Sequence, residues 1–254
     1  MHYPASLDVT VFDTVDSTNT VAKQESCKDT PSLYIAHTQT AGRGRLGRSF
    51  HSPADTGLYM TVAYTTEAPL AEAVGVTAAA AVAASCAMEA LTDKHPAIKW
   101  VNDLYLEGKK MGGILTEAVT RPDGRHRMVV GLGINLTTTH FPEGLRAPAT
   151  CLFSEAEAAC LPADFADTLA GEIARRLLEL TEDPQNGMWG KACLEAYRRR
   201  LLYQGQEVVC TRGNTEIRGV LLGVDDTYSL LLRTEEGDMA LSSGEITLRL
   251  APGQ

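Results

Sequence analysis

The chain has 254 residues and a formal net charge of −9, and 44% of its residues are hydrophobic. This length can bury a substantial core in one large domain, or in a main domain with a small appendage. The acidic balance argues against a broad nucleic-acid-binding surface. The N-terminus has no basic stretch followed by an apolar one, so we expect no signal peptide. Six cysteines without a C-x-x-C spacing indicate reduced thiols in a cytoplasmic protein, and neither a disulfide framework nor a zinc site.

The first predicted elements are a strand, a short helix and two further strands. Alternating β-branched residues predict a strand over 7–12, and the segment D-S-T-N at 16–19 predicts the start of a short helix because all four residues are good N-caps. Strands follow over 32–39 and 57–65. A loop rich in glycine and arginine, at 39–50, lies between them.

The middle of the chain predicts a long helix and a hairpin. Residues 70–91 are rich in alanine and predict a helix that lies close on a sheet, and we expect its uncharged part, 73–88, to be too short and too weakly apolar to span a bilayer. Residues 97–120 predict strand, hairpin and strand, with Gly108 near the turn. A buried strand is expected over 127–136.

The last part of the chain changes in character after Tyr203. Helices are expected over 161–180 and 188–202, and then short strands follow with glycine or aspartate at the turns. This pattern predicts a small antiparallel barrel of about fifty residues, which needs the larger domain to complete its core. We therefore expect an α+β fold with a mixed central sheet and packed helices over 1–203, and a C-terminal β-barrel over 204–254.

The loop Q-T-A-G-R-G-R-L-G-R-S-F at 39–50 gathers three glycines and three arginines. Its glycines match the dinucleotide fingerprint G-x-G-x-x-G, but Pro53 and Gly57 follow where that motif requires a helix. A Walker loop requires lysine after its last glycine, and Arg48 stands there instead. An ordinary exposed turn is one interpretation. The other is a clamp for a small anion that carries carboxylate and phosphate, since arginine offers a forked donor and glycine lets the backbone approach closely.

Two further segments carry candidate chemistry. In K-W-V-N-D-L-Y-L-E-G-K-K-M-G-G-I-L, Lys99, Asn102 and Asp103 lie at a strand end, and Lys110 opens the next strand beside paired glycines. Such a lysine can reach a phosphate or carboxylate, although a solvated hairpin lysine is the simpler alternative. In G-L-G-I-N at 131–135, the glycines either face a ligand or allow a strand to pack closely against a neighbour.

In their joint order these segments resemble the biotin–protein ligases, also called biotin–[acetyl-CoA-carboxylase] ligases. That family carries D-S-T-N, G-R-G-R-x-G-R, K-W-P-N-D, K-x-x-G-I-L, G-x-G-I-N and G-E-I-S-L-R. The corresponding segments here lie at 16–19, 42–48, 99–103, 110–115, 131–135 and 244–249. The chain departs from the pattern at Val101, where proline is usual, and at Phe50, where tryptophan is common. Only fifteen residues precede Asp16, so we expect the monofunctional type without an N-terminal DNA-binding domain.

The resemblance implies a class II synthetase-like catalytic domain that makes biotinyl-5′-AMP from biotin and ATP with Mg²⁺. That domain then transfers biotin to a lysine of the biotin carboxyl carrier domain of a carboxylase. We expect no nucleic-acid or membrane partner, and a homodimer is left open. A lipoate–protein ligase is the alternative within the same fold, and an arginine/glycine-loop nucleic-acid-binding module is the alternative from another class.

The resemblance also implies roles for particular residues. Lys110 and Arg45 are the expected catalytic residues, Phe50 offers an aromatic face to adenine, and Ile114 is expected beside Trp100 and Leu115 in the wall of the apolar part. Glu245 and Arg249 are expected either to close over ATP or to pin the barrel to the main domain. The residues implied in biotin binding are Ser17, Thr18, Asn19, Gln39, Gly42, Arg43, Gly44, Arg45, Trp100, Lys110, Gly113, Leu115 and Gly131. Those implied in ATP or adenylate binding are Arg43, Arg45, Arg48, Phe50, Asn102, Asp103, Lys110 and Asn135, and Asp103 is also the expected Mg²⁺ ligand.

Overall fold

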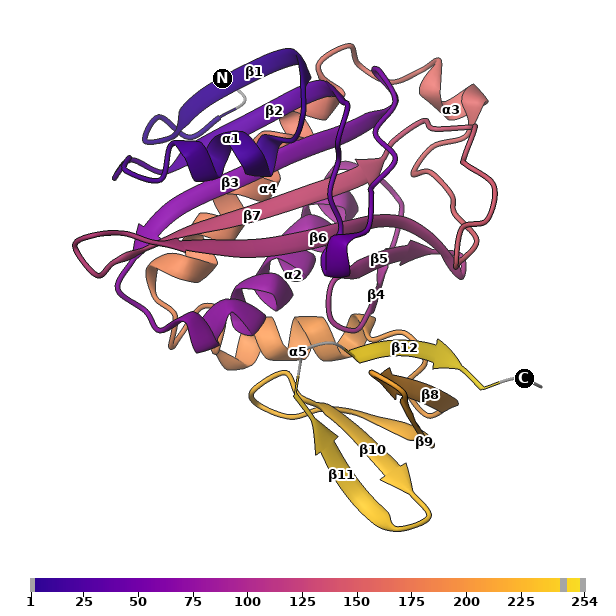
Figure 1. Cartoon of the computed structure of the whole chain (residues 1–254). Coiled ribbons are helices and arrows are strands. Elements are labelled where there is room, and N and C mark those ends of the chain that lie inside the picture. The colour runs from indigo at the N-terminus through magenta and orange to yellow at the C-terminus, as the bar shows by residue number, and fades with distance from the viewer. Residues whose placement is uncertain (1–2, 243–245, 252–254) are drawn as a thin grey trace.

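The computed structural model describes residues 3–242 and 246–251, and its main feature is a seven-stranded mixed sheet (Figure 1). Only the first two strands run parallel, and every other neighbouring pair is antiparallel. The order across the sheet is β1 (Asp8–Val15), β2 (Ser32–Gln39), β3 (Gly57–Thr66), β7 (His126–Asn135), β6 (Lys109–Thr120), β5 (Asp103–Leu106) and β4 (Ala97–Lys99).

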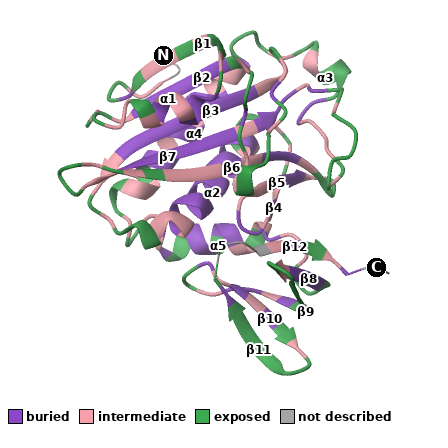
Figure 2. Cartoon of the chain, in the orientation of Figure 1, coloured by how far each residue is buried: buried purple, intermediate pink, exposed green. Residues whose placement is uncertain are grey.

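Helices cover both faces of this sheet. Successive side chains of a strand point to opposite faces, and β2 shows which helix meets which face. Leu33 and Ile35 join the large core under α2 (Ala73–Leu91) and α4 (Phe165–Glu182), whereas Tyr34 packs with Ala22 of α1 (Thr18–Gln24). The strands β2, β3 and β7 are accordingly buried along most of their length (Figure 2). The face that carries α1 is only partly covered, and this is the face on which the site lies.

Helix α2 lies in the core, although its length and composition would also suit a membrane-spanning helix. The stretch Leu70–Leu91 has 22 residues and a mean hydropathy of 1.7 in its most apolar window, so it is long and apolar enough to cross a membrane. The expectation concerned only the uncharged part, 73–88, whereas the longer stretch Leu70–Leu91 meets the requirement by length and composition alone. What distinguishes it is its environment, since 72% of that window is buried inside the protein.

A second sheet of five antiparallel strands follows α5 (Lys191–Arg200) and lies beside it (Figure 1). Its order is β11 (Gly237–Leu241), β10 (Leu230–Thr234), β9 (Thr215–Val224), β8 (Glu207–Arg212) and β12 (Ile246–Leu250). The chain passes from one sheet to the other between Arg200 and Glu207, and the expected boundary at residues 203 and 204 falls in this connection.

The second sheet shares one continuous apolar core with the first, as its small size predicts. Tyr228 is the main link. Its hydroxyl donates to the carbonyl of Met188, and its own carbonyl accepts the indole N–H of Trp100 at 2.8 Å. Its ring also contacts Tyr197 of α5 edge to face, with 5.3 Å between ring centroids. These contacts tie the small sheet to the strand end that carries the K-W-V-N-D segment.

Local sequence signals predict some of the remaining elements and miss others. The predicted hairpin turn is formed by Glu107 and Gly108, both with positive φ, as a two-residue turn of this kind requires. The helix expected from residue 161 begins only at Phe165, because Pro162 disfavours helical geometry at the residue before it. A short helix α3 (Glu155–Ala158), capped by Ser154 and Glu157, was not anticipated.

Candidate active site

A pocket lies on the sheet face opposite α2, between the start of α1, the glycine–arginine loop and strands β6 and β7. Strand alternation brings residues 113 and 115 of β6 and residues 131 and 133 of β7 to this face. The two β7 glycines are needed for clearance. A Cβ on Gly131 would stand 2.1 Å from Oδ1 of Asn19, and a Cβ on Gly133 would stand 2.5 Å from the ring of Phe50. The G-x-G spacing therefore lets a helix start and a loop rest directly on the strand.

One end of the pocket is neutral and is built by α1 and the end of β2. Oε1 of Gln39 accepts the backbone N–H of Thr18 at 2.9 Å, and Nε2 of Gln39 donates to Ser52 at 3.1 Å. Asn19 donates a hydrogen bond to Glu117 and accepts one from Thr61. Ser17 is the N-cap residue of α1, but its side chain makes no capping hydrogen bond, and within the described residues its hydroxyl has no protein partner. Apart from Arg43, which reaches it from the loop, this end offers donors and acceptors without net charge.

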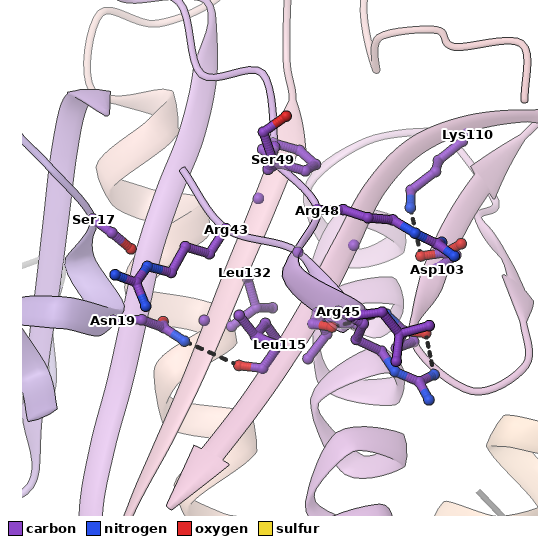
Figure 3. A pocket seen from close by; sticks show the side chains of 18 of the residues that line it. Ser17, Asn19, Arg43, Arg45, Arg48, Ser49, Asp103, Lys110, Leu115 and Leu132 are labelled. Atoms are coloured by element: carbon purple, nitrogen blue, oxygen red, sulfur yellow. Dashed lines mark hydrogen bonds and ion pairs between the residues drawn. The ribbon is translucent and has the colours of Figure 1, made fainter. Parts of the chain in front are cut away.

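The other end is strongly cationic. Five basic side chains line the pocket against one carboxylate, that of Asp103, among the described residues, and all of them except Arg43 lie at this end. Nζ of Lys110 lies 2.6 Å from Oδ1 of Asp103, and Arg45 donates to Oδ1 of Asn102 at 3.0 Å (Figure 3). Burial lowers the pKa of Lys99, and the neighbouring Lys110 and Arg48 lower it further. Burial also lowers the pKa of Arg45. An anion that enters here therefore relieves unfavourable charge crowding.

The glycine–arginine loop closes on itself above the sheet. The backbone N–H of Phe50 donates to the carbonyl of Gly42 at 2.8 Å, and a Cβ on Gly42 would stand 2.5 Å from the carbonyl oxygen of Phe50, so this approach requires glycine. A short 3₁₀ turn, η1 (Arg45–Gly47), forms the tip. Arg43 extends toward Ser17 and Asn19, whereas Arg48 lies toward Asp103 and Lys110 (Figure 3). The loop thus serves both ends of the pocket.

All but two of the residues implied in biotin, ATP or adenylate binding line this pocket. The exceptions are Gly42, which shapes the loop, and Asn135, whose amide nitrogen donates to the carbonyl of Thr150 at 3.0 Å. Trp100 lines the pocket but is only 4% exposed, because its indole N–H is committed to Tyr228. The roles assigned to these residues stay predictions.

At the C-terminal end, Arg249 donates to Glu216 of its own sheet at 2.8 Å, so in this structure it neither closes over the pocket nor pins the two sheets together. Glu245 lies outside the described residues.

Several pocket residues were given no role by the sequence. Lys99 was noted only as lying at a strand end, although it is the register partner of Asp103 across β4 and β5, which a hairpin interpretation of K-W-V-N-D would have revealed. Met60 and Leu132 come from strand interiors. Thr247 and Leu248 come from β12 of the second sheet; they belong to the segment at 244–249 that carries the resemblance, but no role was expected of them.

The described residues contain no group of three or more histidine, cysteine, aspartate or glutamate side chains that could hold a metal ion on their own. Asp103, the expected Mg²⁺ ligand, is a single carboxylate already bonded to Lys110. A Mg²⁺ ion held mainly by phosphate and water oxygens requires no more than one or two protein carboxylates. The residues present therefore fit an ion that is bound together with a nucleotide.

A mixed sheet with this pocket on one face and a second antiparallel sheet at its side is the architecture of a biotin or lipoate protein ligase. Residues 11–135 match the biotin/lipoate A/B protein ligase family. The bifunctional ligase/repressor BirA of Bacillus subtilis is 32% identical over 245 residues, which cover 93% of this chain and 72% of that protein. The biotin–[acetyl-CoA-carboxylase] ligase of Paracoccus denitrificans is 31% identical over 241 residues, which cover 91% and 96%.

Solved structures agree with these matches. The biotin protein ligase of Aquifex aeolicus in complex with biotin and ATP superposes with a TM-score of 0.76 at 28% identity, covering 96% of this chain and 99% of that one. A point mutant of the same enzyme in complex with biotin gives a TM-score of 0.80 at 27% identity, with the same coverage. The chain belongs to the biotin protein ligase family.

Proposed function

We propose that the chain activates biotin with ATP to give biotinyl-5′-AMP and pyrophosphate, and then transfers the biotinyl group to a lysine of a biotin carboxyl carrier domain. One observation carries the proposal: a single pocket joins a neutral hydrogen-bonding end to a cationic end on the same sheet face. Biotin has this polarity, with a neutral ureido ring at one end and a carboxylate at the other. ATP adds its phosphates to the cationic end.

In the first step a carboxylate oxygen of biotin attacks the α-phosphorus of ATP. A bond forms between that oxygen and phosphorus, and the bond from the α-phosphorus to the pyrophosphate oxygen breaks. Both reactants are anions, so the protein has to hold them together against their repulsion. Lys110 is well placed for this role because its ammonium already lies beside Asp103 at the pocket and can move to an incoming oxygen. Arg45 and Arg48 add charge from the loop.

A Mg²⁺ ion that accompanies ATP would supply further charge neutralisation here. Asp103 is the carboxylate in this pocket that could contact such an ion. Lys110 can turn from this carboxylate toward the reacting oxygens, because its ammonium is a point charge on a flexible stem.

In the second step the amine of the acceptor lysine attacks the acyl carbon of the adenylate. An amide bond forms, the acyl–oxygen bond breaks, and AMP leaves. Until then the mixed anhydride has to be kept from water. We assign this task to the loop over residues 42–50, whose Arg45 side chain is anchored to Asn102 beneath it.

ATP–pyrophosphate exchange with purified protein tests the proposal directly. We expect exchange that depends on biotin and not on lipoate, and subsequent labelling of a carrier domain at one lysine. Lipoate-dependent exchange would instead support the lipoate–protein ligase alternative, whose acyl group has no ureido ring for the neutral end. Salt-sensitive RNA binding without any exchange would support the nucleic-acid alternative.

A further inference from the structure

Asn19 is held by a polar network that extends behind the pocket to β6. Its Nδ2 donates to Oε2 of Glu117 at 2.9 Å and lies 3.3 Å from the carbonyl oxygen of Leu115. Its Oδ1 accepts the hydroxyl of Thr61 at 2.6 Å. The other carboxylate oxygen of Glu117 accepts the ammonium of Lys23 from α1 at 2.6 Å. Glu117 does not line the pocket and has no part in the mechanism above.

This network determines which way the amide of Asn19 faces. The carboxylate of Glu117 and the carbonyl of Leu115 can only accept hydrogen bonds, so the NH₂ group of Asn19 has to point to them. Both of its hydrogens are then used on protein acceptors. Oδ1 is left on the pocket side, directly above the Cα of Gly131. A carbonyl oxygen accepts two hydrogen bonds, and Thr61 fills one of them. The remaining position can accept an N–H from a ligand.

The charge on Glu117 makes this arrangement robust. Burial alone would raise the pKa of Glu117, but the hydrogen bonds from Lys23 and Asn19 outweigh burial and hold the pKa below its usual range. The side chain is therefore an ionised acceptor at neutral pH and cannot donate to Asn19. The Lys23–Glu117 pair is about a quarter exposed on each side, so its own contribution to stability is small.

We propose that Glu117 is a positioning residue that locks Asn19 with its acceptor oxygen toward the ligand, and so selects ligands with an N–H group at this point. The inference rests on the proposed function, in which that group is a ureido N–H of biotin. A carboxylate at position 117 enforces one orientation of Asn19. An amide at the same position could turn its own NH₂ toward Asn19, and both orientations of Asn19 would then be populated.

Glu117→Gln therefore keeps the size of the side chain and removes the constraint. We expect the KM for biotin to rise about tenfold, which corresponds to about 1.4 kcal/mol of binding free energy. The kcat for pyrophosphate exchange at saturating ATP should stay within about twofold, because the reacting carboxylate lies at the other end of the pocket. Lys23→Met, assayed at about pH 8 so that Glu117 stays ionised without this partner, is the matched control, since it removes the ion pair but leaves the bond between Glu117 and Asn19.

The specific readout is discrimination between biotin and an analogue in which the ureido N–H that faces Asn19 is replaced by N–CH₃. Both mono-methyl isomers are measured by pyrophosphate exchange on the wild type, Glu117→Gln and Lys23→Met, with the thermal midpoint of each recorded. We expect the wild type and Lys23→Met to discriminate strongly against one isomer. In Glu117→Gln that ratio should fall by about tenfold, because the KM for biotin rises while the KM for that isomer changes little.

An unchanged ratio in a folded Glu117→Gln, or an equal rise in KM for biotin and both isomers, would overturn the inference in favour of a purely structural role. If the wild type shows no biotin-dependent exchange, it is the proposed function that fails. A crystal structure of the wild type with biotin gives a test that does not depend on how the variant folds. We expect Nδ2 of Asn19 to stay on Glu117 and Oδ1 to lie within hydrogen-bonding distance of a ureido nitrogen. An Asn19 that has left Glu117 in that complex would refute the assignment.

Discussion

Replacement of Lys110 by alanine separates the catalytic role that we propose for this residue from its structural one. In the structure its ammonium lies 2.6 Å from Asp103, with the two side chains 33% and 22% exposed. A pair of this exposure contributes roughly 0.2–1 kcal/mol to stability. Asp103 also interacts with two other cations, because burial lowers the pKa of both Arg45 and Lys99 and the charge of Asp103 raises it again in part. We therefore expect Lys110→Ala to lower the thermal midpoint by at most about 4 °C, the shift that 1 kcal/mol produces in a chain of this size.

The effect on chemistry should be far larger. Loss of one preorganised charge-stabilising donor costs roughly 10²–10³ in rate, or about 2.7–4 kcal/mol of transition-state stabilisation. Lys110 would act where two anions approach, so we expect adenylate formation to fall by about this factor. Single-turnover formation of biotinyl-5′-AMP, measured at saturating biotin and ATP, isolates the step. Saturation matters because it removes any contribution from weaker substrate binding.

Lys109 provides the matched control, since it precedes Lys110 on the same strand, is exposed and does not line the pocket. Lys109→Ala should form adenylate at the wild-type rate. The reasoning is refuted if Lys110→Ala makes adenylate within about threefold of wild type, or if its lost activity follows a thermal midpoint lowered by much more than the pair can account for.

Three further predictions concern the loop and the cationic end. Arg45→Gly should still form adenylate but release it roughly ten- to a hundredfold faster, the factor for one lost charge-assisted hydrogen bond; biotin blotting of an unrelated lysine-rich protein should show new labelling, and wild-type labelling would contradict the retention role. Residues 40–52 should gain hydrogen-exchange protection on addition of biotin and ATP, because three glycines make the free loop costly to order; equal protection in both states would contradict this. Lys99→Met should raise the thermal midpoint at pH 7 while weakening ATP binding. Because burial lowers the pKa of Lys99, its charged form costs the folded state stability below the folded pKa, and this gain should shrink as pH rises toward the ordinary lysine value of 10.5. A gain independent of pH would mean that charge is not its origin.

Local chemistry explains which parts of the fold were predictable. The start of α1 follows from four N-cap residue types in a row, and the β5–β6 turn follows from Gly108 between two strand patterns. Both signals depend on a few adjacent residues. The start of α4 was misplaced because helical periodicity was given more weight than Pro162, whose effect on its neighbour is equally local.

The reasons behind the motifs were less predictable than the motifs themselves. Gly131 and Gly133 stand out in the sequence, but their purpose is to clear Asn19 and Phe50, which lie more than eighty residues earlier in the chain. The Lys110–Asp103 pair depends on a register shift between Leu104 and Tyr105 that strand propensity does not indicate. Such contacts come from tertiary packing, so a sequence pattern can mark the position without stating its partner.

The two ends of the pocket also differ in where their charges lie and in how these charges are balanced. At the neutral end the loop contributes Arg43, and the charges of Lys23 and Glu117 lie outside the pocket, where they balance each other and fix the direction of an uncharged amide. At the cationic end the charges lie inside and exceed the one carboxylate available among the described lining residues. The hydrogen-bonding groups of the neutral end are therefore preorganised before the ligand arrives, whereas the excess positive charge of the cationic end is neutralised only by an anion. Because a ligand that binds only the folded state stabilises it according to its concentration relative to its Kd, ATP or the adenylate should stabilise the protein more than biotin does at equal ligand concentration, and most of that difference should disappear at high salt.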